Sequence, residues 1–398
     1  MNVTTPGIWP PAATVDSCLE RIRALEPSIH AWVEVAPQPR TGPGLLTGIP
    51  FGAKDIIETR GLATEYGSPI YEGRIGTHDA AIIQLLRDRG AILLGKTHTT
   101  AFAYRTPAPT RNPHNLAHTP GGSSSGSAAA VAAGMVPFAI GSQTQGSVLR
   151  PASYCGVTGF KPSYGVLPID GVLPVAPTLD TLGLFTRTPS EMLALWNAMG
   201  YAVDDPGECA IGFVDRLPMV DGDMRASFDS AIERFRTGRL ELHAIDLADL
   251  MASLMDANTT VMFYEAARIH EQRYAEFGDR LEHMAALVRE GLAMPRSKYV
   301  DARSLIDRYR PTVSELLNRT PILVLPAATG AAPEGLTWTG DARMNAPWTA
   351  LGTPAISIPL PVTGLPLGLQ IVGAVGDDAR VLRTAARLHA MLTAEPGT

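Results

Sequence analysis

The feature that most limits what this chain can fold into is the run from Thr119 to Gly165, TPGGSSSGSAAAVAAGMVPFAIGSQTQGSVLRPASYCGVTGFKPSYG. Glycine and serine gather there in two clusters, Gly121 to Ser127 and Gly141 to Ser147. An alanine-rich segment and the apolar run from Val136 to Ile140 separate the clusters. Glycine has no Cβ, so another group can approach its backbone closely. The run therefore indicates a ligand site built close to the backbone.

The same run predicts its own local structure. Ser124 or Ser125 can cap a helix over about Gly126 to Ala133, because alanine is the best helix former. Val136 to Ile140 suits a short buried strand, and a second short helix can begin at Ser147. Loop serines then stand at both ends of a helix–strand unit, so folding can bring the two clusters together.

Two assignments of a nucleophilic serine compete. Gly122 to Gly126 fits G-x-S-x-G, the nucleophile elbow of α/β-hydrolases. That motif follows a strand directly, whereas the preceding residues, NLAHTP from Asn115 to Pro120, are turn sequence. The second assignment is Ser147, which follows the expected strand in a loop whose N–H groups can face an oxyanion.

GGSSSGSAAAVAAG followed by GSQTQGSVLRPASYCGVTGFKPSYG resembles the amidase signature family, which cleaves amides with a Ser–cis-Ser–Lys triad. The resemblance implies Ser147 as nucleophile, Ser123 as the bridging serine behind a cis peptide bond, and Lys54 of GIPFGAKD as base. GKTHTTAFA, LGTPAISIP and GLPLGLQIVG extend it over most of the chain. The implied fold class is α/β, a single large domain with a central mixed twisted β-sheet covered by helices on both faces.

The resemblance also implies a mechanism. Neutral Lys54 takes a proton from Ser123, Ser123 takes one from Ser147, and Ser147 attacks the amide carbon to give an acyl-enzyme and ammonia. Fixed donors around the oxyanion typically contribute ~3 kcal/mol each to lowering the barrier. The expected donors are the backbone N–H groups of Thr144, Gln145, Gly146 and Ser147.

Lys54 must be uncharged to act as a base, and the sequence around it points in two directions. A lone lysine is usually a solvated surface charge. The apolar and small neighbours of Lys54 instead favour burial, which lowers the pKa of an amine from about 10.4. Asp55 would favour the protonated amine if its carboxylate lay close.

Two positions depart from the D-T-G-G-S that is usual in the family. Gln143 stands at the acidic position, and Gln145 replaces the first glycine. Gln145 puts in doubt any local conformation that needs a positive φ, and its side chain can narrow the pocket. We expect an active enzyme with an altered choice of substrate, and the alternative is a damaged oxyanion hole.

Arg150, three residues after Ser147, is the candidate substrate-binding residue. A helix places such residues on one face, so Arg150 can pair with a substrate carboxylate near the acyl site. The alternative is a structural arginine that binds carbonyl groups or an internal acid. The first interpretation favours small acidic amides, as in malonamidase-type members of the family. Further pocket candidates are Trp338, Asn345 and Trp348, and packing is the alternative explanation for all three.

Composition limits the ligands and partners. The net charge is −6 with no basic patch, so no nucleic acid is expected, and no apolar stretch of about 18 residues predicts a membrane segment. Three scattered cysteines and the absence of HExxH, Walker A or a well-placed G-x-G-x-x-G argue against a metal or cofactor. MNVTTPGIWPP does not read as a signal peptide, which makes the cytoplasm the expected location. A small amide is the expected ligand, and a homodimer is the candidate assembly.

We expect one amidase domain over residues 1–398. Its parts are a signature core at about 48–188, helical cover at about 204–317, and C-terminal strands with a closing helix at 321–392. His98 is interpreted as a hydrogen-bonded structural histidine. Two other functions stay open. The first is the A subunit of a glutamine-dependent amidotransferase, which releases ammonia for a partner. The second is a non-catalytic complex subunit with an amidase fold, and the presence of the complete triad argues against it.

Overall fold

The computed structural model describes residues 13–204, 207–217 and 219–394. These residues contain one 11-stranded mixed sheet with the order β1-β3-β2-β4-β6-β5-β10-β11-β9-β7-β8. The strands are β1 (Trp32–Val35), β2 (Pro50–Lys54), β3 (Ile92–Thr97), β4 (Phe138–Gln143), β5 (Thr158–Lys161), β6 (Thr181–Thr186), β7 (Ile211–Val214), β8 (Leu242–Ile245), β9 (Ile322–Pro326), β10 (Ala355–Pro359) and β11 (Gly368–Gly373). Residues 1–12, on which the signal-peptide expectation rests, lie outside the described part.

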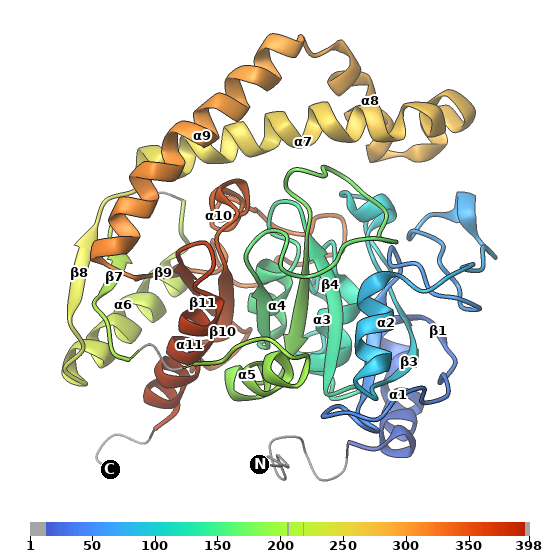
Figure 1. The fold of residues 1–398 in the computed structure, drawn as a ribbon, viewed down its shortest axis with the longest axis horizontal. Coiled ribbons are helices and arrows are strands. Elements are labelled where there is room, and N and C mark those ends of the chain that lie inside the picture. The colour runs from blue at the N-terminus through green and yellow to red at the C-terminus, as the bar shows by residue number, and fades with distance from the viewer. Residues whose placement is uncertain (1–12, 205–206, 218, 395–398) are drawn as a thin grey trace.

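Helices cover both faces of this sheet, so the fold class expected from the sequence is confirmed (Figure 1). The helices on one face are α1 (Val15–Ile29), α3 (Ser125–Ala132) and α4 (Leu149–Cys155). Those that pack on the other are α5 (Pro189–Ala198), α6 (Gly222–Thr237) and α11 (Asp378–Thr393). The α2 helix (Ala81–Asp88) contributes to the larger of the core clusters.

The elements expected in the central run are confirmed with small shifts. The first helix, α3, begins at Ser125 after an N-cap at Ser124, and β4 begins at Phe138 instead of Val136. The second helix, α4, begins at Leu149. The apolar stripe expected on the closing helix, α11, is buried at all five positions: Val381, Leu382, Ala385, Leu388 and Leu392.

The strand pairing fixes where the central run meets the upstream lysine. The β2 and β4 strands are parallel neighbours, and Ala53 pairs with Ile140. The C-terminal ends of parallel neighbours meet at the same edge of a sheet, so Lys54, the last residue of β2, lies beside the end of β4. All five residues of β2 are buried, as is usual for a strand between two parallel neighbours.

The segment 204–317 is not purely helical cover, and that prediction is wrong for its first part. It begins with β7, α6 and β8, which form a parallel unit that extends the sheet beyond β9. The two strands have four residues each, and β8 is only partly buried, so neither leaves a clear pattern in the sequence. The rest is helical and spans one end of the sheet, as α7 (Ala248–Phe277), α8 (His283–Ala293) and α9 (Arg296–Arg319) (Figure 1).

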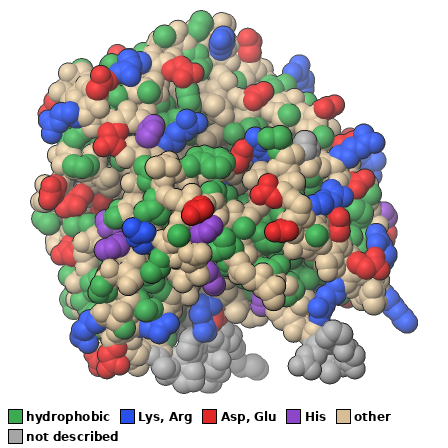
Figure 2. All heavy atoms as spheres, turned by 180° about the vertical axis from the view of Figure 1, so that it is seen from behind, with side chains coloured by type: hydrophobic (Ala, Val, Ile, Leu, Met, Phe, Trp, Pro, Cys, Tyr) green, Lys and Arg blue, Asp and Glu red, His purple; other side chains and the backbone are tan. Residues whose placement is uncertain are grey.

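The surface carries charges of both signs. On the face seen in Figure 2, acidic and basic side chains are interspersed among apolar ones. None of the helices in the described ranges is long and apolar enough to cross a membrane. Within the same ranges, no group of three or more His, Cys, Asp or Glu side chains is arranged to hold a metal ion.

Candidate active site

The Lys54 side chain is fully buried and ends among three serine hydroxyls. Its Nζ lies 2.7 Å from Ser123 Oγ, 2.9 Å from Ser142 Oγ and 3.1 Å from Ser124 Oγ. Burial lowers the pKa of Lys54 well below its usual range, and the charge of Asp180 opposes this only in part. The site therefore favours an uncharged amine directly beside Ser123.

Asp55 does not hold Lys54 in its protonated form. Asp55 is the first residue after β2, and its carboxylate is directed toward the loop that follows. Its carboxylate accepts N–H bonds of 3.0 Å from Glu65 and Gly67 and lies 3.9 Å from Lys96 Nζ. Burial raises the pKa of Asp55 to about 6 and lowers that of Lys96 to about 8. The expected alternative, a charged Lys54–Asp55 pair, is thus not what the fold forms.

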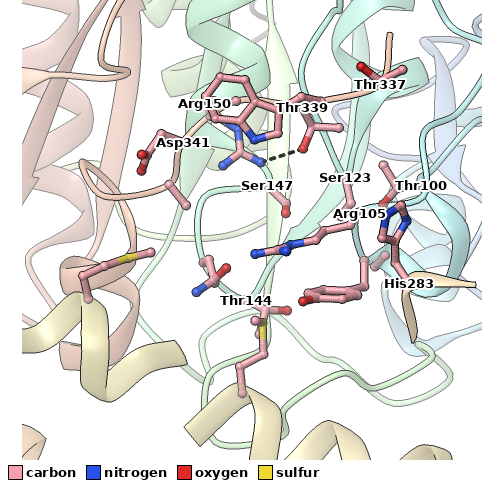
Figure 3. A pocket seen from close by; sticks show the side chains of 18 residues that line it. Thr100, Arg105, Ser123, Thr144, Ser147, Arg150, His283, Thr337, Thr339 and Asp341 are labelled. Carbon is pink, nitrogen blue, oxygen red and sulfur yellow. Dashed lines mark hydrogen bonds between the residues drawn. The ribbon is translucent and has the colours of Figure 1, made fainter. Parts of the chain in front are cut away.

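The two serine clusters meet at one cavity of about 430 Å³, lined by both Ser123 and Ser147. The peptide bond before Ser123 is cis, as the family resemblance implied. Figure 3 shows the Ser123 and Ser147 side chains in this cavity. Ser124, the central serine of the elbow pattern, is fully buried, and it contacts the backbone of Ser142 instead of lining the cavity. With no strand directly before it, the elbow assignment is wrong.

The loop from Thr144 to Ser147 presents its N–H groups without internal acceptors. None of these four N–H groups donates to another group in the part of the chain that the structure describes. The carbonyl groups, in contrast, are held in place. Asn258 Nδ2 donates to Thr144 O at 3.1 Å, and Thr349 Oγ1 donates to Gln145 O at 2.8 Å. The loop is thus fixed through its carbonyls while its N–H groups stay available to an oxyanion.

Gln143 stands where the family usually has an acidic residue, and its side chain forms hydrogen bonds without a charge. Its Oε1 accepts from Val148 N at 2.9 Å and from Leu149 N at 3.1 Å, which caps the first turn of α4. Its Nε2 donates to Thr349 Oγ1 at 3.0 Å, a bond that a carboxylate could not donate. The same threonine donates to the carbonyl of Gln145, so Gln143 helps to hold the loop from Thr144 to Ser147.

Gln145 fits the loop without backbone strain. It is not among the described residues with a positive φ, so the conformational doubt raised by the sequence does not apply. Its side chain lies in the cavity wall and donates to Asn258 Oδ1 at 3.0 Å and Thr259 Oγ1 at 3.1 Å. At Gly146, in contrast, a Cβ would lie 2.5 Å from Asn345 Oδ1, so any larger residue would displace the buried Asn345 side chain.

Sequence reasoning missed Asp180 as a support of this loop. Asp180 Oδ1 accepts a 2.6 Å bond from Thr144 Oγ1, and Oδ2 accepts bonds of 2.8 and 2.9 Å from Val175 N and Ala176 N. Burial raises its pKa to about 6, although these bonds oppose the shift. The only sequence signal was its place in TLDTLG, between two elements of the signature core.

Arg150 lines the cavity and is only partly satisfied by the protein. Its Nη2 donates to Gly122 O at 2.7 Å and to Thr339 Oγ1 at 3.4 Å (Figure 3). The side chain is 6% exposed, and its buried Nε has no hydrogen-bond partner among the described residues. Both interpretations of Arg150 thus have support, because the guanidinium binds a carbonyl and also faces the cavity.

Of the other proposed pocket residues, one lines the cavity and two do not. Trp338 lines the cavity, whereas Asn345 and Trp348 are fully buried and do not. His98 lies outside the cavity, where burial lowers its pKa to about 4, in agreement with a structural role. Sequence reasoning missed Arg105, which Figure 3 shows on the opposite side of Ser147 from Arg150.

Comparisons with known proteins were consistent with one another. The sequence model of the Amidase family matches residues 13–382. The chain is 31% identical over 405 residues to the A subunit of glutamyl-tRNA(Gln) amidotransferase from Exiguobacterium sibiricum, covering 85% of this chain and 83% of that one. It is 29% identical over 450 residues to the same protein of Halothermothrix orenii, covering 96% and 94%. Similar solved structures include an amidase (27% identity, TM-score 0.86, 96% of each chain). Another is the native peptide amidase of Stenotrophomonas maltophilia (25% identity, TM-score 0.81, 96% of this chain and 93% of that one).

Proposed function

The chain belongs to the amidase family and is a hydrolase of amide bonds, and from that premise we propose that it cleaves a small, carboxylate-bearing amide to an acid and ammonia through a Ser147 acyl-enzyme. One observation carries the proposal. The buried amine of Lys54, whose pKa is lowered, lies 2.7 Å from Ser123 at a cavity that Ser147 also lines. A neutral amine in that place can accept a proton, and an ammonium cannot.

The proposed reaction moves one proton in each direction along the triad. Lys54 accepts the Ser123 proton as Ser123 accepts the Ser147 proton, and the Ser147 oxygen bonds to the amide carbon. The same proton returns through Ser123 to the amide nitrogen, the carbon–nitrogen bond breaks, and ammonia leaves. Water then attacks the ester carbon by the same route, which releases the acid and restores Ser147.

The developing oxyanion is expected to bind the free N–H groups of the loop after β4. Such donors stabilise the transition state most when they are already fixed before the reaction. The contacts of Gln143, Asn258 and Thr349 supply that fixation from three separate elements.

The proposal is tested by measuring ammonia release from malonamate-like, urea-derived and neutral amides. We expect release with at least one acidic amide and none above background from the Ser147→Ala variant. If no amide of the three classes releases ammonia, or if the variant is as active as the unchanged protein, the proposed reaction is wrong. Absence of release from every class would favour the non-catalytic alternative.

Replacing Arg150 with alanine is expected to lower kcat/KM for a carboxylated amide about 10- to 100-fold more than for its neutral analogue, since a hydrogen bond to a charged group contributes about 1.5–3 kcal/mol. The comparison of the two substrates separates the roles of the residue. Loss of the Gly122 contact affects both substrates equally, whereas loss of a carboxylate contact affects one. Unchanged selectivity would show that Arg150 is structural only.

Replacing Asp180 with asparagine is expected to move the acid limb of the kcat/KM profile to lower pH. The pKa of this carboxyl is raised to about 6 by burial, so the carboxylate that holds Thr144 exists above about pH 6 and is lost below it. Its charge also raises the pKa of Lys54, and removing that charge lets the amine stay neutral at lower pH. The measurement is a full pH profile of both proteins. An acid limb that does not move would contradict both the role of the Asp180 carboxylate in holding Thr144 and the effect of its charge on the pKa of Lys54.

A second candidate function follows from the relatives that are named as the A subunit of glutamyl-tRNA(Gln) amidotransferase. In that role the chain would hydrolyse glutamine and supply the ammonia to a partner protein. Size-exclusion chromatography of the purified chain, combined with the ammonia assay on glutamine, separates the two candidates. Release from acidic amides by the isolated chain favours the free-standing amidase, and release that requires a copurifying partner favours the amidotransferase role.

A further inference from the structure

An apolar groove opens beside the catalytic cavity, along the first two turns of α7. Its volume is about 270 Å³. The apolar side chains that line it are Leu217, Ala248, Met251, Ala252, Met255 and Met344. We call it the methionine groove. Four charged residues also line it: Arg216 and Asp256 are exposed to solvent, whereas Asp341 and Arg343 are half-buried and paired with each other.

The methionine groove borders the catalytic cavity. Met255 and Asp341 line both spaces, so these two side chains form their common boundary. Asp341 is held at this junction by Arg343, whose Nη2 and Nε lie 2.6 and 2.9 Å from Asp341 Oδ2 and whose backbone N lies 2.8 Å from Oδ1. Figure 3 shows Asp341 beside Arg150 in the cavity. A molecule bound near Ser147 therefore reaches the groove only by passing Met255 and Asp341.

The two spaces offer different chemistry to such a molecule. Hydroxyl, amide and guanidinium groups surround Ser147, whereas six of the ten residues that line the groove present thioether or alkyl groups. Binding sites match polar groups with polar partners and apolar groups with apolar walls. Methionine is flexible and polarisable, so three methionines can adapt to alkyl groups of different shape. The combined site thus fits a ligand that is polar at one end and apolar at the other.

We infer that the methionine groove binds an apolar group on the acyl part of the substrate, so that the natural substrate is an acidic amide that carries an alkyl or aryl extension. This inference rests on the proposed function. The leaving group of that reaction is ammonia, so every additional atom of the substrate must belong to the acyl part. The groove would then select for the length of the apolar extension on the substrate, while Arg150 selects for the substrate carboxylate.

A homologous series of malonamates with hydrogen, methyl, butyl or octyl on the central carbon tests the inference. Each methylene that enters the groove is expected to raise kcat/KM about three- to fourfold until the groove is full, because burial of a methylene contributes about 0.8 kcal/mol. A flat or falling series would overturn the inference.

A blocking variant locates the effect. Ala252 is exposed on α7 and lines the groove, so Ala252→Trp fills the groove without disturbing the core. We expect the ratio of butyl- to unsubstituted-malonamate turnover to fall at least tenfold. Ala275, also exposed on α7, does not line the groove, and Ala275→Trp is expected to leave the ratio unchanged. An unchanged ratio in Ala252→Trp would place the alkyl group elsewhere and overturn the inference.

Calorimetry with malonate and 2-octylmalonate separates this inference from the proposed reaction, because neither diacid contains an amide to cleave. The unchanged protein is expected to bind the octyl compound at least tenfold more tightly, and Ala252→Trp is expected to erase the difference. If that binding is seen but no amide is hydrolysed, the groove stands and the proposed reaction fails. If amides are hydrolysed but the octyl group adds no affinity, or if neither diacid binds, the groove inference is wrong.

Discussion

Lys54→Met is expected to lower kcat/KM for amide hydrolysis by a factor of about 10²–10⁴, the usual contribution of a general base. Methionine has a similar length and tolerates the buried position, but it cannot accept the Ser123 proton. Ser123 would then lose the partner that lies 2.7 Å away, while the rest of the cavity would stay in place. The measurement is steady-state kinetics on the best amide of the screen, with the melting temperature as a check on folding.

Lys161→Met is the matched control for removing a buried amine. Lys161 is fully buried, and its Nζ donates to Pro162 O at 3.1 Å and also to Thr353 O, away from the serine clusters. Burial lowers its pKa to about 7, so it resembles Lys54 in environment but not in location. We expect Lys161→Met to keep activity within tenfold. Equal losses in the two variants would show that burial, and not base catalysis, explains the effect at Lys54.

Ser147→Ala is expected to remove nearly all activity, by a factor on the order of 10⁶, as for other enzymes that lose their nucleophile. Among the described residues, no other hydroxyl in the cavity combines partial exposure with a position in the loop of free N–H groups. Binding of a product acid should persist, because the Arg150 contact does not depend on the Ser147 hydroxyl. Single-turnover assays at high enzyme concentration measure the residual rate.

Ser124→Ala is the control that distinguishes Ser147 from the serine of the elbow pattern. Ser124 is fully buried, and its hydroxyl accepts from Lys54 and contacts the Ser142 backbone. Its loss should disturb the orientation of the lysine and lower kcat moderately, about tenfold, because misplacing a base is less costly than removing the nucleophile. An inactive Ser124→Ala together with an active Ser147→Ala would restore the nucleophile elbow and overturn the assignment of Ser147.

Local features of this chain could be predicted because short-range physics determines them. The alanine-rich helix α3, the apolar strand β4 and the stripe of α11 each carry their signal within one segment. Strand β2 carries no such signal. Its parallel partners on both sides bury all five residues of PFGAK, so no alternation of apolar and polar residues is left to detect. The short β7 and β8 were missed for lack of length.

The contacts that make the site work join residues far apart in the sequence. Lys54 meets Ser123 and Ser142 only because β2 and β4 pair in parallel. The bond between Asp180 and Thr144 likewise depends on a fold that a single sequence does not show in detail. The family resemblance indicated the three triad positions, but it did not indicate that Asp55 faces Lys96 or that Gln143 holds the loop from Thr144 to Ser147 through Thr349.

The protonation state of Lys54 can be measured directly, because the sequence contains only four lysines, at positions 54, 96, 161 and 298. Lysine labelled with carbon-13 at Cε gives one signal for each, and Lys54→Met identifies the signal of interest. We expect Lys54 to show the chemical shift of a neutral amine throughout the pH range in which the protein hydrolyses amides, and to become an ammonium only on acidification. A Lys54 signal that keeps the ammonium shift across that range would contradict the proposal that this amine is the base.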